Sequence, residues 1–359
     1  MKKVLFLVNY DLGLYNFRRE LVERLLSDGN KVIISSPYGD RIEDFIKMGC
    51  EYREITLNRR GMNPISEIKL LRAYNKLLKE VKPDIVFTYT IKPNIYGAIA
   101  CRKYKIPCVC NITGLGTAIE NKGLAQKICV FLYKFALKKA KKVFFQNNEN
   151  REFFVKHNIA VDKHDLLPGS GVNLNRFTPL EYPSKEKIEF AFISRIMRDK
   201  GIDHYLDTAK YIKGKYENAV FHVCGFCEQD YEDKLKQLHD EGIIVYHGMV
   251  KDVKAFLTNI HCVIHPSYHE GLSNVLLESA SCARPIITTN CAGCKEVVDD
   301  GENGYLVNVR DTEDLTQKTE KFISLPYEDK VNMGKLGRVK VEREFDRQIV
   351  VEKYVETLN

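Results

Sequence analysis

The chain of 359 residues contains no apolar run that approaches the length of a membrane-spanning helix, which needs about 18 consecutive apolar residues. Its first residues, Met1-Lys2-Lys3, precede a short apolar run that ends at Val8, and Asn9 and Asp11 then interrupt the pattern. A signal peptide has a longer apolar region, so this segment is better explained as a first buried strand. We therefore expect the protein to remain in the cytoplasm.

The chain also lacks the patterns of two common classes of binding protein. The loop from Thr113 to Thr117 contains Gly114 and Gly116 but no third glycine, so it is not a dinucleotide-binding fingerprint. No helix-turn-helix pattern and no aromatic and basic RNA motif occurs. Binding of nucleic acid would then depend on the positive charge of the chain alone.

Disulfides are not indicated, although the chain has eleven cysteines. Two close pairs, Cys224/Cys227 and Cys291/Cys294, have the C-x-x-C spacing that zinc sites use. They are far apart in the sequence, and each lies at the end of an expected strand. Reduced and mostly buried thiols in a cytosolic protein are the favoured interpretation.

The net charge of +7 is unevenly distributed along the chain. Residues 1–170 hold 30 Lys and Arg against 17 Asp and Glu, whereas the remaining residues hold 25 against 31. A basic half beside an acidic half indicates a partner of negative charge for the first half. Nucleic acid and the inner leaflet of a membrane both fit this description.

Short apolar runs alternate with helical patterns along the chain, which predicts doubly wound parallel sheets. The length suggests about two domains, and a glycine- and proline-containing hinge at residues 168–173 separates two such alternating units. Strands are expected at residues 3–8, 31–36, 52–57, 84–89, 143–146, 188–194, 220–224 and 243–246. Helices are expected near residues 16–26, 41–48, 66–82 and 124–142.

Residues 262–307 form the most informative stretch, because they predict a strand, a polar loop, a helix and a second strand. Ligands bind at the carboxyl ends of such strands, where Glu270 lies, and Glu278 follows about two helical turns later. Backbone N–H groups near Gly271, Leu272 and Ser273 would suit a phosphate. The carboxylates would instead accept hydrogen bonds from hydroxyl groups. This combination predicts a nucleotide-sugar as the ligand.

The pair Glu270 and Glu278, with His-Pro-Ser before it and the Gly293–Glu296 motif after it, resembles the signature of family 4 retaining glycosyltransferases. The resemblance extends over essentially the whole chain. It is strongest to transferases of bacterial capsule, O-antigen and lipid-linked oligosaccharide assembly, including undecaprenyl-diphosphate-linked N-acetylgalactosaminyltransferases. It implies the GT-B fold, with two facing Rossmann-like domains and a cleft between them. Residues 1–168 would form the acceptor domain and residues 172–344 the donor domain, with a helix at 345–359 crossing back.

The resemblance also implies roles for donor-site residues. Glu270 would bind hydroxyls of the donor sugar and support the transition state, Glu278 would hold the ribose, and Arg195 and Lys200 would neutralise the diphosphate. Backbone near Gly248, Met249 and Val250 would bind the base. The remaining donor-side positions are Gly271, Leu272, Ser273, Asn274 and Gly13, the last in an expected loop before the first helix. No Asp-x-Asp pair occurs, so we expect neither a metal nor another cofactor.

Acceptor-side residues follow from the same resemblance. Lys92 would contact an acceptor diphosphate, and Thr90 replaces the histidine that many relatives carry. The loop with Thr113, Gly114 and Gly116 would shape the acceptor site, with Arg59 and Arg60 close to lipid.

The helical pattern at residues 124–142 combines apolar side chains with lysines. Its apolar residues are Leu124, Ile128, Phe131, Leu132 and Phe135. Such a helix can lie in a bilayer interface or pack on the sheet. We expect the apolar face to pack inside and the lysines to face lipid headgroups.

These features predict transfer of a hexose or N-acetylhexosamine from a nucleoside-diphosphate sugar, with UDP as the expected nucleotide. The acceptor would be a polyprenyl-diphosphate-linked glycan, and the enzyme would be peripherally associated with the cytoplasmic membrane. Three alternatives remain: a soluble transferase for a small acceptor, a UDP-sugar epimerase of the same fold, and a nucleic-acid-binding protein. The sugar, the linkage, the route to retention and the oligomeric state do not follow from the sequence.

Overall fold

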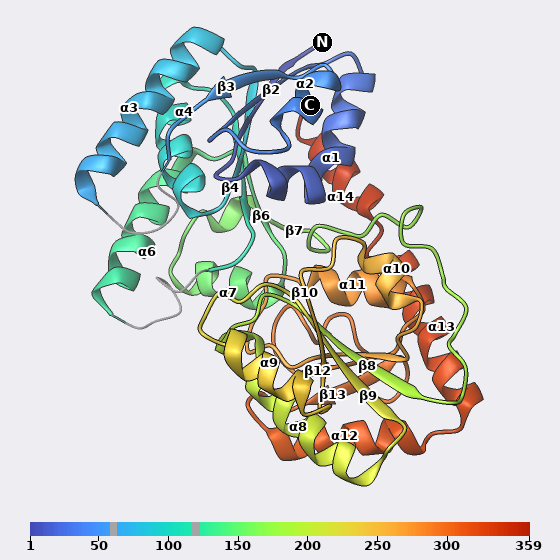
Figure 1. Cartoon of the computed structure of the whole chain (residues 1–359). Helices are drawn as coiled ribbons and strands as arrows, with labels where there is room; N and C mark the ends of the chain where they lie inside the picture. The colour runs from blue at the N-terminus through green and yellow to red at the C-terminus, as the bar shows by residue number, and fades with distance from the viewer. Residues whose placement is uncertain (58–62, 116–122) are drawn as a thin grey trace. The chain divides into compact units, whose positions relative to one another are not determined.

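The computed structural model describes residues 1–57, 63–115 and 123–359 (Figure 1). The chain divides into two compact units. Unit 1 comprises Met1–Ser170 together with Arg347–Asn359, and unit 2 comprises Gly171–Asp346. Each unit is described by itself below.

In unit 1, the described residues form a seven-stranded sheet in the order β3-β2-β1-β4-β5-β6-β7, and neighbouring strands are parallel. The strands are β1 (Lys3–Leu7), β2 (Lys31–Ser36), β3 (Glu51–Glu54), β4 (Ile85–Tyr89), β5 (Cys108–Ile112), β6 (Lys142–Phe145) and β7 (His164–Leu166). The α-helices are α1 (Asp11–Ser27), α2 (Ile42–Lys47), α3 (Pro64–Val81), α4 (Ala98–Tyr104), α6 (Leu124–Ala136), α7 (Asn148–Lys156) and α14 (Arg347–Glu356). Shorter turns are the π-helix η1 (Pro93–Gly97) and the 3-10 helices η2 (Leu137–Lys139) and η3 (Val161–Lys163).

Side chains of the central strand β1 alternate between the two faces of this sheet. Val4 and Phe6 join the core beneath α1 and α14, whereas Leu5 and Leu7 join the core beneath α3, α4 and α6. Helices cover both faces (Figure 1), which is why β1 is apolar at successive positions. Tyr354 of α14 is buried, and its hydroxyl accepts a hydrogen bond from Asn111 Nδ2 at 2.7 Å. The last helix is therefore part of the unit 1 core.

In unit 2, six parallel strands follow the order β10-β9-β8-β11-β12-β13 within the described residues. They are β8 (Ile188–Ile193), β9 (Ala219–Cys224), β10 (Val245–Gly248), β11 (Cys262–His265), β12 (Ile286–Thr289) and β13 (Gly304–Val307). The helices are η4 (Arg198–Lys200), α8 (Ile202–Lys215), α9 (Glu232–Asp240), α10 (Val253–Leu257), α11 (Asn274–Ser281), α12 (Thr312–Ser324) and α13 (Tyr327–Glu344).

Strand order reverses between β8 and β11 in unit 2 and between β1 and β4 in unit 1. Connections leave such a pair of strands toward opposite faces of the sheet, so an opening forms at their carboxyl ends. The predicted Rossmann-like architecture is thus confirmed in both units, and β2 has the predicted limits. The topology places the residues that follow β8 and β11 next to one another.

Two expectations about local structure are wrong. Gly13 was expected in a loop, but it lies in the first turn of α1, which begins at Asp11. Asp11 is buried at this position, and its carboxylate accepts a hydrogen bond from the Arg41 N–H at 2.7 Å. The helix thus begins five residues earlier than the apolar periodicity indicated. The helical pattern of residues 272–281 predicted a helix that begins at Leu272, but the helix with Glu278 begins at Asn274.

The eleven cysteines all lie in the described residues and none forms a disulfide. Nine are buried, while Cys227 and Cys291 are partly exposed. Burial raises the pKa of the Cys50 and Cys224 thiols to about 12, which keeps them protonated and unreactive near neutral pH. The expected burial of most thiols is confirmed.

Candidate active site at the carboxyl ends of β8 and β11

The predicted cations and the predicted catalytic carboxylate follow two adjacent strands. Arg195 and Lys200 come after β8, and Glu270 comes after β11, which pairs directly with β8. The two loops are also joined by hydrogen bonds: the Tyr268 N–H donates to Asp199 O at 2.9 Å. Gly201 allows this approach, because a Cβ there would lie 2.0 Å from Pro266 O. Both loops therefore meet at the switch point of the unit 2 sheet.

Glu270 is held by two basic side chains. Lys200 Nζ lies 2.6 Å from Glu270 Oε1, and His265 Nε2 lies 3.0 Å from the same oxygen. A carboxylate can only accept hydrogen bonds, so Nε2 of His265 carries the proton in this contact. Lys200 is 9% exposed and His265 is 1% exposed, which makes this a mostly desolvated cluster.

The surroundings keep Glu270 ionised. Burial alone would raise the pKa of its carboxyl group, but the hydrogen bond from His265 and the charge of Lys200 outweigh burial and lower the pKa to about 2. A permanent negative charge at this place can accept hydrogen bonds from hydroxyl groups. It can also stabilise a positive charge that develops on a sugar ring.

The loop after β12 supports Glu270 from behind. The Glu270 N–H donates to Ala292 O at 3.1 Å, and the Ser273 N–H donates to Gly293 O at 2.8 Å. Gly293 has φ +81°, and a Cβ there would lie 2.6 Å from the Glu270 backbone and side chain. Only glycine fits this position without displacing Glu270.

Because of these contacts, the backbone N–H groups that could bind an anion differ from the predicted ones. The Ser273 N–H was expected to face a phosphate, but it is bound to Gly293 O. The first intrahelical bond of α11 runs from Leu277 to Ser273, so the N–H groups of Asn274, Val275 and Leu276 precede it. The positive end of the helix dipole thus begins at Asn274. Leu272 is buried in the core, whereas Gly271 and Glu278 are partly exposed, with Glu278 on α11 itself.

The predicted base-binding residues lie beside Arg195. A cavity of about 160 Å³ is lined by Ser194, Arg195, Gly225, Phe226, Met249 and Val250. Gly248 closes the same edge, because its carbonyl accepts a hydrogen bond from the Gly225 N–H at 2.8 Å. The structure therefore brings Arg195, Gly248, Met249 and Val250 together.

Two residues of this site were given no role from the sequence. Glu228 forms an ion pair with Arg195, and His265 binds Glu270. His265 had a sequence signal, because it ends the apolar run of β11 directly before Pro266. Glu228 had none, since a single acidic residue in a loop is usually solvated.

In unit 1, the described acceptor residues follow two different strands, β4 and β5. Lys92 Nζ forms an ion pair with Glu67 Oε1 of α3 at 2.6 Å, and both side chains are mostly buried. Thr113 and Gly114 follow β5 and are partly exposed. Thr90, directly after β4, has φ +70°, an unusual conformation for a β-branched residue. Arg59, Arg60 and Gly116 lie outside the described residues.

The expectation for the basic helix α6 is wrong. Its buried residues are Cys129, Tyr133 and Ala136, whereas most of the apolar face that was expected to pack inside is exposed. The exposed fractions are 74% for Leu124, 43% for Ile128, 69% for Phe131 and 48% for Phe135. Cys129, Tyr133 and Ala136 are buried because their side of α6 packs against α4 and η1.

No group of three or more His, Cys, Asp or Glu side chains among the described residues is arranged to hold a metal ion. No described helix combines the length and the apolar character needed to cross a bilayer.

Family models match in both units. The model described as glycosyl transferase 4-like matches residues 3–147, and the model described as glycosyl transferases group 1 matches residues 187–324. Together they cover most of both sheets.

Curated relatives match over most of their length. The chain is 25% identical to the N,N'-diacetylbacillosaminyl-diphospho-undecaprenol alpha-1,3-N-acetylgalactosaminyltransferase of Campylobacter jejuni, covering 98% of this chain and 96% of that protein. It is 29% identical to the UDP-Gal:alpha-D-GlcNAc-diphosphoundecaprenol alpha-1,3-galactosyltransferase of Escherichia coli, covering 77% and 75%.

Among solved structures, the Anabaena protein Alr3699/HepE in complex with UDP and glucose is similar over 100% of this chain and 99% of that chain. The TM-score is 0.81 at 16% sequence identity. The likeness shows that the two proteins share the GT-B fold.

Proposed function

The chain belongs to the group 1, family 4-like glycosyltransferases, and we propose that it transfers a sugar from a UDP-sugar to a polyprenyl-diphosphate-linked glycan with retention of configuration. The sugar would be a hexose or an N-acetylhexosamine. The reaction would serve assembly of a bacterial surface polysaccharide or related glycan.

One observation carries the donor part of this proposal: Lys200, Glu270 and His265 converge at the unit 2 switch point. Without donor, the Lys200 ammonium is compensated by Glu270 at 2.6 Å. A diphosphate would offer Lys200 a second anionic partner, while Glu270 would turn to the hydroxyls of the sugar. As the glycosidic bond breaks, negative charge grows on the diphosphate, and Lys200 and Arg195 would stabilise it increasingly.

The neighbouring cavity supports a nucleoside at the other end of the donor. Arg195 lies in its wall together with Met249 and Val250, and the same Arg195 is paired with Glu228. We propose that the base lies against backbone near Gly248 and that Glu278 on α11 holds the ribose. The relatives whose names or structures include UDP support UDP as the nucleotide.

Neutralisation of the diphosphate by two side chains would make a divalent metal unnecessary. The positive end of α11 at Asn274 adds a third source of favourable potential. We propose a metal-independent reaction, and activity should persist in a chelator such as EDTA.

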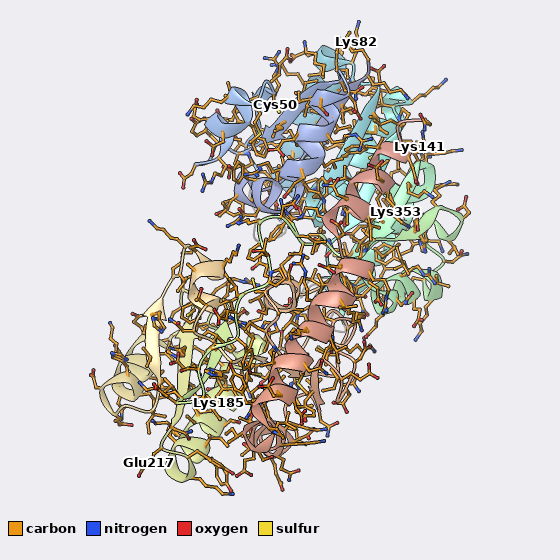
Figure 2. The ribbon with its side chains drawn as sticks, turned by 90° about the vertical axis from the view of Figure 1, so that its right-hand side faces the viewer. Cys50, Lys82, Lys141, Lys185, Glu217 and Lys353 are labelled. Carbon is orange, nitrogen blue, oxygen red and sulfur yellow. The ribbon has the colours of Figure 1, made fainter. Side chains whose placement is uncertain are left out.

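The acceptor part of the proposal is supported by the similarity over nearly the whole chain to an undecaprenol-linked transferase. Unit 1 also carries the excess of basic residues. Basic side chains such as Lys82 and Lys141 are exposed on this unit (Figure 2). We propose peripheral association with the cytoplasmic membrane, where such an acceptor resides.

Calorimetry with UDP tests the donor site. Arg195→Ala should weaken UDP binding by about tenfold, since a hydrogen bond to a charged group contributes about 1.5 kcal/mol or more. Arg195 is exposed, so its removal leaves the core unchanged. Arg343→Ala on α13, which removes another exposed arginine, this one paired with Glu344, is the control.

Lys200→Gln should weaken UDP binding similarly and also slow transfer, because it removes a contact that strengthens in the transition state. Unchanged UDP affinity in both the Arg195 and Lys200 variants would refute the proposed donor site. Transfer to a water-soluble acceptor but never to a lipid-linked one would refute the proposed acceptor.

A further inference from the structure

An apolar stripe runs along the outer surface of α6. Leu124, Ile128, Phe131 and Phe135 follow one another at helical spacing and are between 43% and 74% exposed. The opposite side of the helix packs on η1 and α4 through Cys129, Tyr133 and Ala136. Four neighbouring large apolar side chains on one exposed face mark an interaction surface rather than scattered surface residues.

The helix and the residues that follow it carry charge of one sign. Residues 123–148 contain six lysines and no acidic residue. Lys127, Lys134 and Lys138 are exposed on α6 and the turn that follows it, and Arg102 of α4 lies over the Phe135 ring at 5.0 Å. The partner of this face must therefore be apolar at its centre and negatively charged at its rim.

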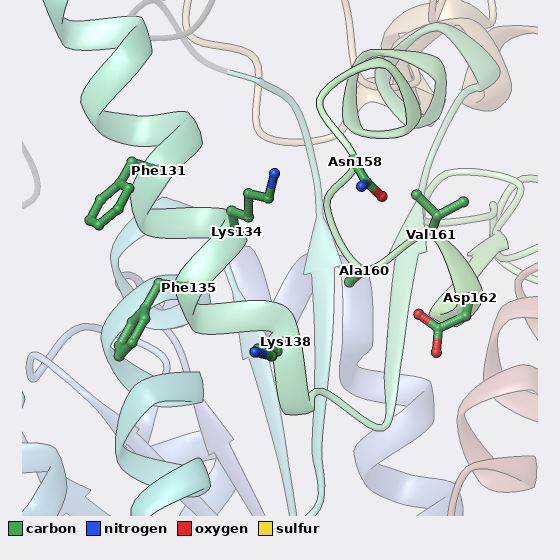
Figure 3. A pocket seen from close by; sticks show the side chains of 8 residues that line it. All are labelled: Phe131, Lys134, Phe135, Lys138, Asn158, Ala160, Val161 and Asp162. Atoms are coloured by element: carbon green, nitrogen blue, oxygen red, sulfur yellow. The ribbon is translucent and has the colours of Figure 1, made fainter.

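A groove lies beside the stripe, between α6 and the segment of residues 158–162. It has a volume of about 790 Å³ and is lined by Phe131, Lys134, Phe135, Lys138, Asn158, Ala160, Val161 and Asp162. Figure 3 shows the Lys134 side chain extending from α6 toward this segment, while Phe131 and Phe135 point to the other side of the helix. Val161 adds an apolar side chain that is 42% exposed, and the charged side chains of the lining are Lys134, Lys138 and Asp162.

The helix α3 repeats this combination on the same face of the sheet. Ile65 and Ile68 are 66% and 53% exposed, and Lys69, Arg72 and Lys76 continue that surface toward the end of the helix. Both α3 and α6 pack against α4, and Figure 1 shows them on one side of unit 1. The second helix makes the basic and apolar surface wider than α6 alone.

We propose that the outer face of α6, defined by Leu124, Ile128, Phe131, Phe135, Lys134 and Lys138, docks into an anionic phospholipid bilayer. The apolar stripe enters the boundary between headgroups and acyl chains. The lysines extend along the surface to the phosphates, and the groove receives headgroups beside the helix. An interfacial helix needs both an apolar face and basic flanks, and charge complementarity favours lipid over an uncharged protein partner. This inference rests on the proposed function and extends it, because it assigns the element of the chain that binds the membrane.

The absence of tryptophan in the chain allows a direct test of insertion. A single tryptophan introduced by Phe131→Trp should shift its emission to shorter wavelength when vesicles of phosphatidylcholine with phosphatidylglycerol are added. Tyr211→Trp on α8 of unit 2 is the matched control, because Tyr211 is 53% exposed and lies outside the proposed face. Its emission should not change. No shift for Phe131→Trp would overturn the proposal.

Vesicle sedimentation separates the apolar and charged contributions. Lys134→Gln with Lys138→Gln should lower the partition coefficient about 30-fold, because each basic residue near an anionic surface contributes about 1 kcal/mol. Lys210→Gln with Lys213→Gln on α8 should leave it unchanged. Leu124→Ser with Phe131→Ser should lower it at least about tenfold without lowering the melting temperature, since both side chains are exposed.

Two other results would contradict membrane docking. Partition that is insensitive to both pairs of substitutions would place the binding surface elsewhere. A dimer seen by analytical ultracentrifugation that Leu124→Ser with Phe131→Ser dissociates would identify a second copy of the chain as the occupant. Vesicle binding is measured without donor or acceptor, so its failure leaves the proposed reaction standing. Loss of UDP binding in the Arg195 variant would equally leave the docking result unaffected.

Discussion

At the scale of single residues, Glu270 lies at the centre of a mostly buried polar cluster in unit 2. Its carboxylate faces Lys200 and His265, and its backbone is bound to the loop after β12. A buried ion pair is costly to disturb, because removal of either Lys200 or Glu270 leaves the other charge uncompensated. Stability and chemistry therefore depend on the same few contacts.

This arrangement predicts a defined pH dependence of stability. The pKa of Glu270 is lowered to about 2, below its unfolded value of about 4.3. A depressed carboxyl pKa contributes stability above the unfolded pKa, and this contribution, on the order of 3 kcal/mol, is lost as the pH falls from about 4.3 toward 2. Melting curves of the wild type and of Glu270→Gln should therefore converge in this range. A constant difference between them down to pH 2 would contradict the assigned shift.

Gly293 predicts an effect on catalysis transmitted through the backbone. Gly293→Ala places a Cβ 2.6 Å from Glu270, so Glu270 must move, and misplacement by about 1 Å can cost about 100-fold in rate. Gly242→Ala is the matched control: it has a similar φ of +72°, but no atom lies within 4 Å of its Cβ. Both variants should lose at least about 1 kcal/mol of stability because of the positive φ, Gly293→Ala should lose more because its Cβ displaces Glu270, and only Gly293→Ala should lose turnover. Equal turnover in a steady-state assay would argue against a positioning role.

Part of this site was predicted from the sequence. The position of Glu270 after a buried strand indicated a ligand site, whereas the roles of Arg195 and Lys200 followed from the resemblance to family 4 glycosyltransferases. Glu228 was missed because its partner Arg195 is 33 residues away. The ion pair between Lys92 and Glu67 was missed for the same reason, since 25 residues separate them.

At the scale of secondary structure elements, strands were predicted more reliably than helix faces. Runs such as residues 31–36 are apolar on both faces, and only the interior of a parallel sheet covers both. The short strand β7, His164–Leu166, was missed because it contains His164 and Asp165 and no apolar run. Pairing with β6 determines this strand, and pairing is not visible in local sequence.

Helix α6 shows why an apolar periodicity does not identify the buried face. Its stripe of large side chains and its stripe of Cys129, Tyr133 and Ala136 have the same period, so the pattern permits either orientation. The orientation is decided by the space beside η1 and α4, which admits the smaller stripe and the Tyr133 ring against Phe154 at 5.1 Å. Tertiary packing thus overrides the general tendency of a helix to bury its most apolar stripe.

At the scale of the whole molecule, charge is divided between the two units. Unit 1 contains residues 1–170, in which basic residues exceed acidic residues by 13, and Arg347–Asn359, which add two of each sign. Unit 2 contains the acidic excess. Fields of this kind act over roughly 10 Å at about 0.1 M salt and over only about 3 Å at 1 M. An anionic membrane would attract unit 1 and would not attract unit 2.

This division predicts that salt acts on the encounter with the membrane and not on the chemical step. Raising NaCl from about 0.05 to 0.5 M shortens the Debye length by about threefold. It should therefore raise the apparent KM for an acceptor embedded in anionic vesicles by at least about tenfold, while kcat stays nearly constant. With a short-chain, water-soluble acceptor and the same UDP-sugar, both parameters should change by less than about twofold, because the contacts of the Lys200 and Glu270 cluster are mostly desolvated and weakly screened. Equal salt inhibition with both acceptors would locate the charge effect in the donor site instead of the membrane-facing surface.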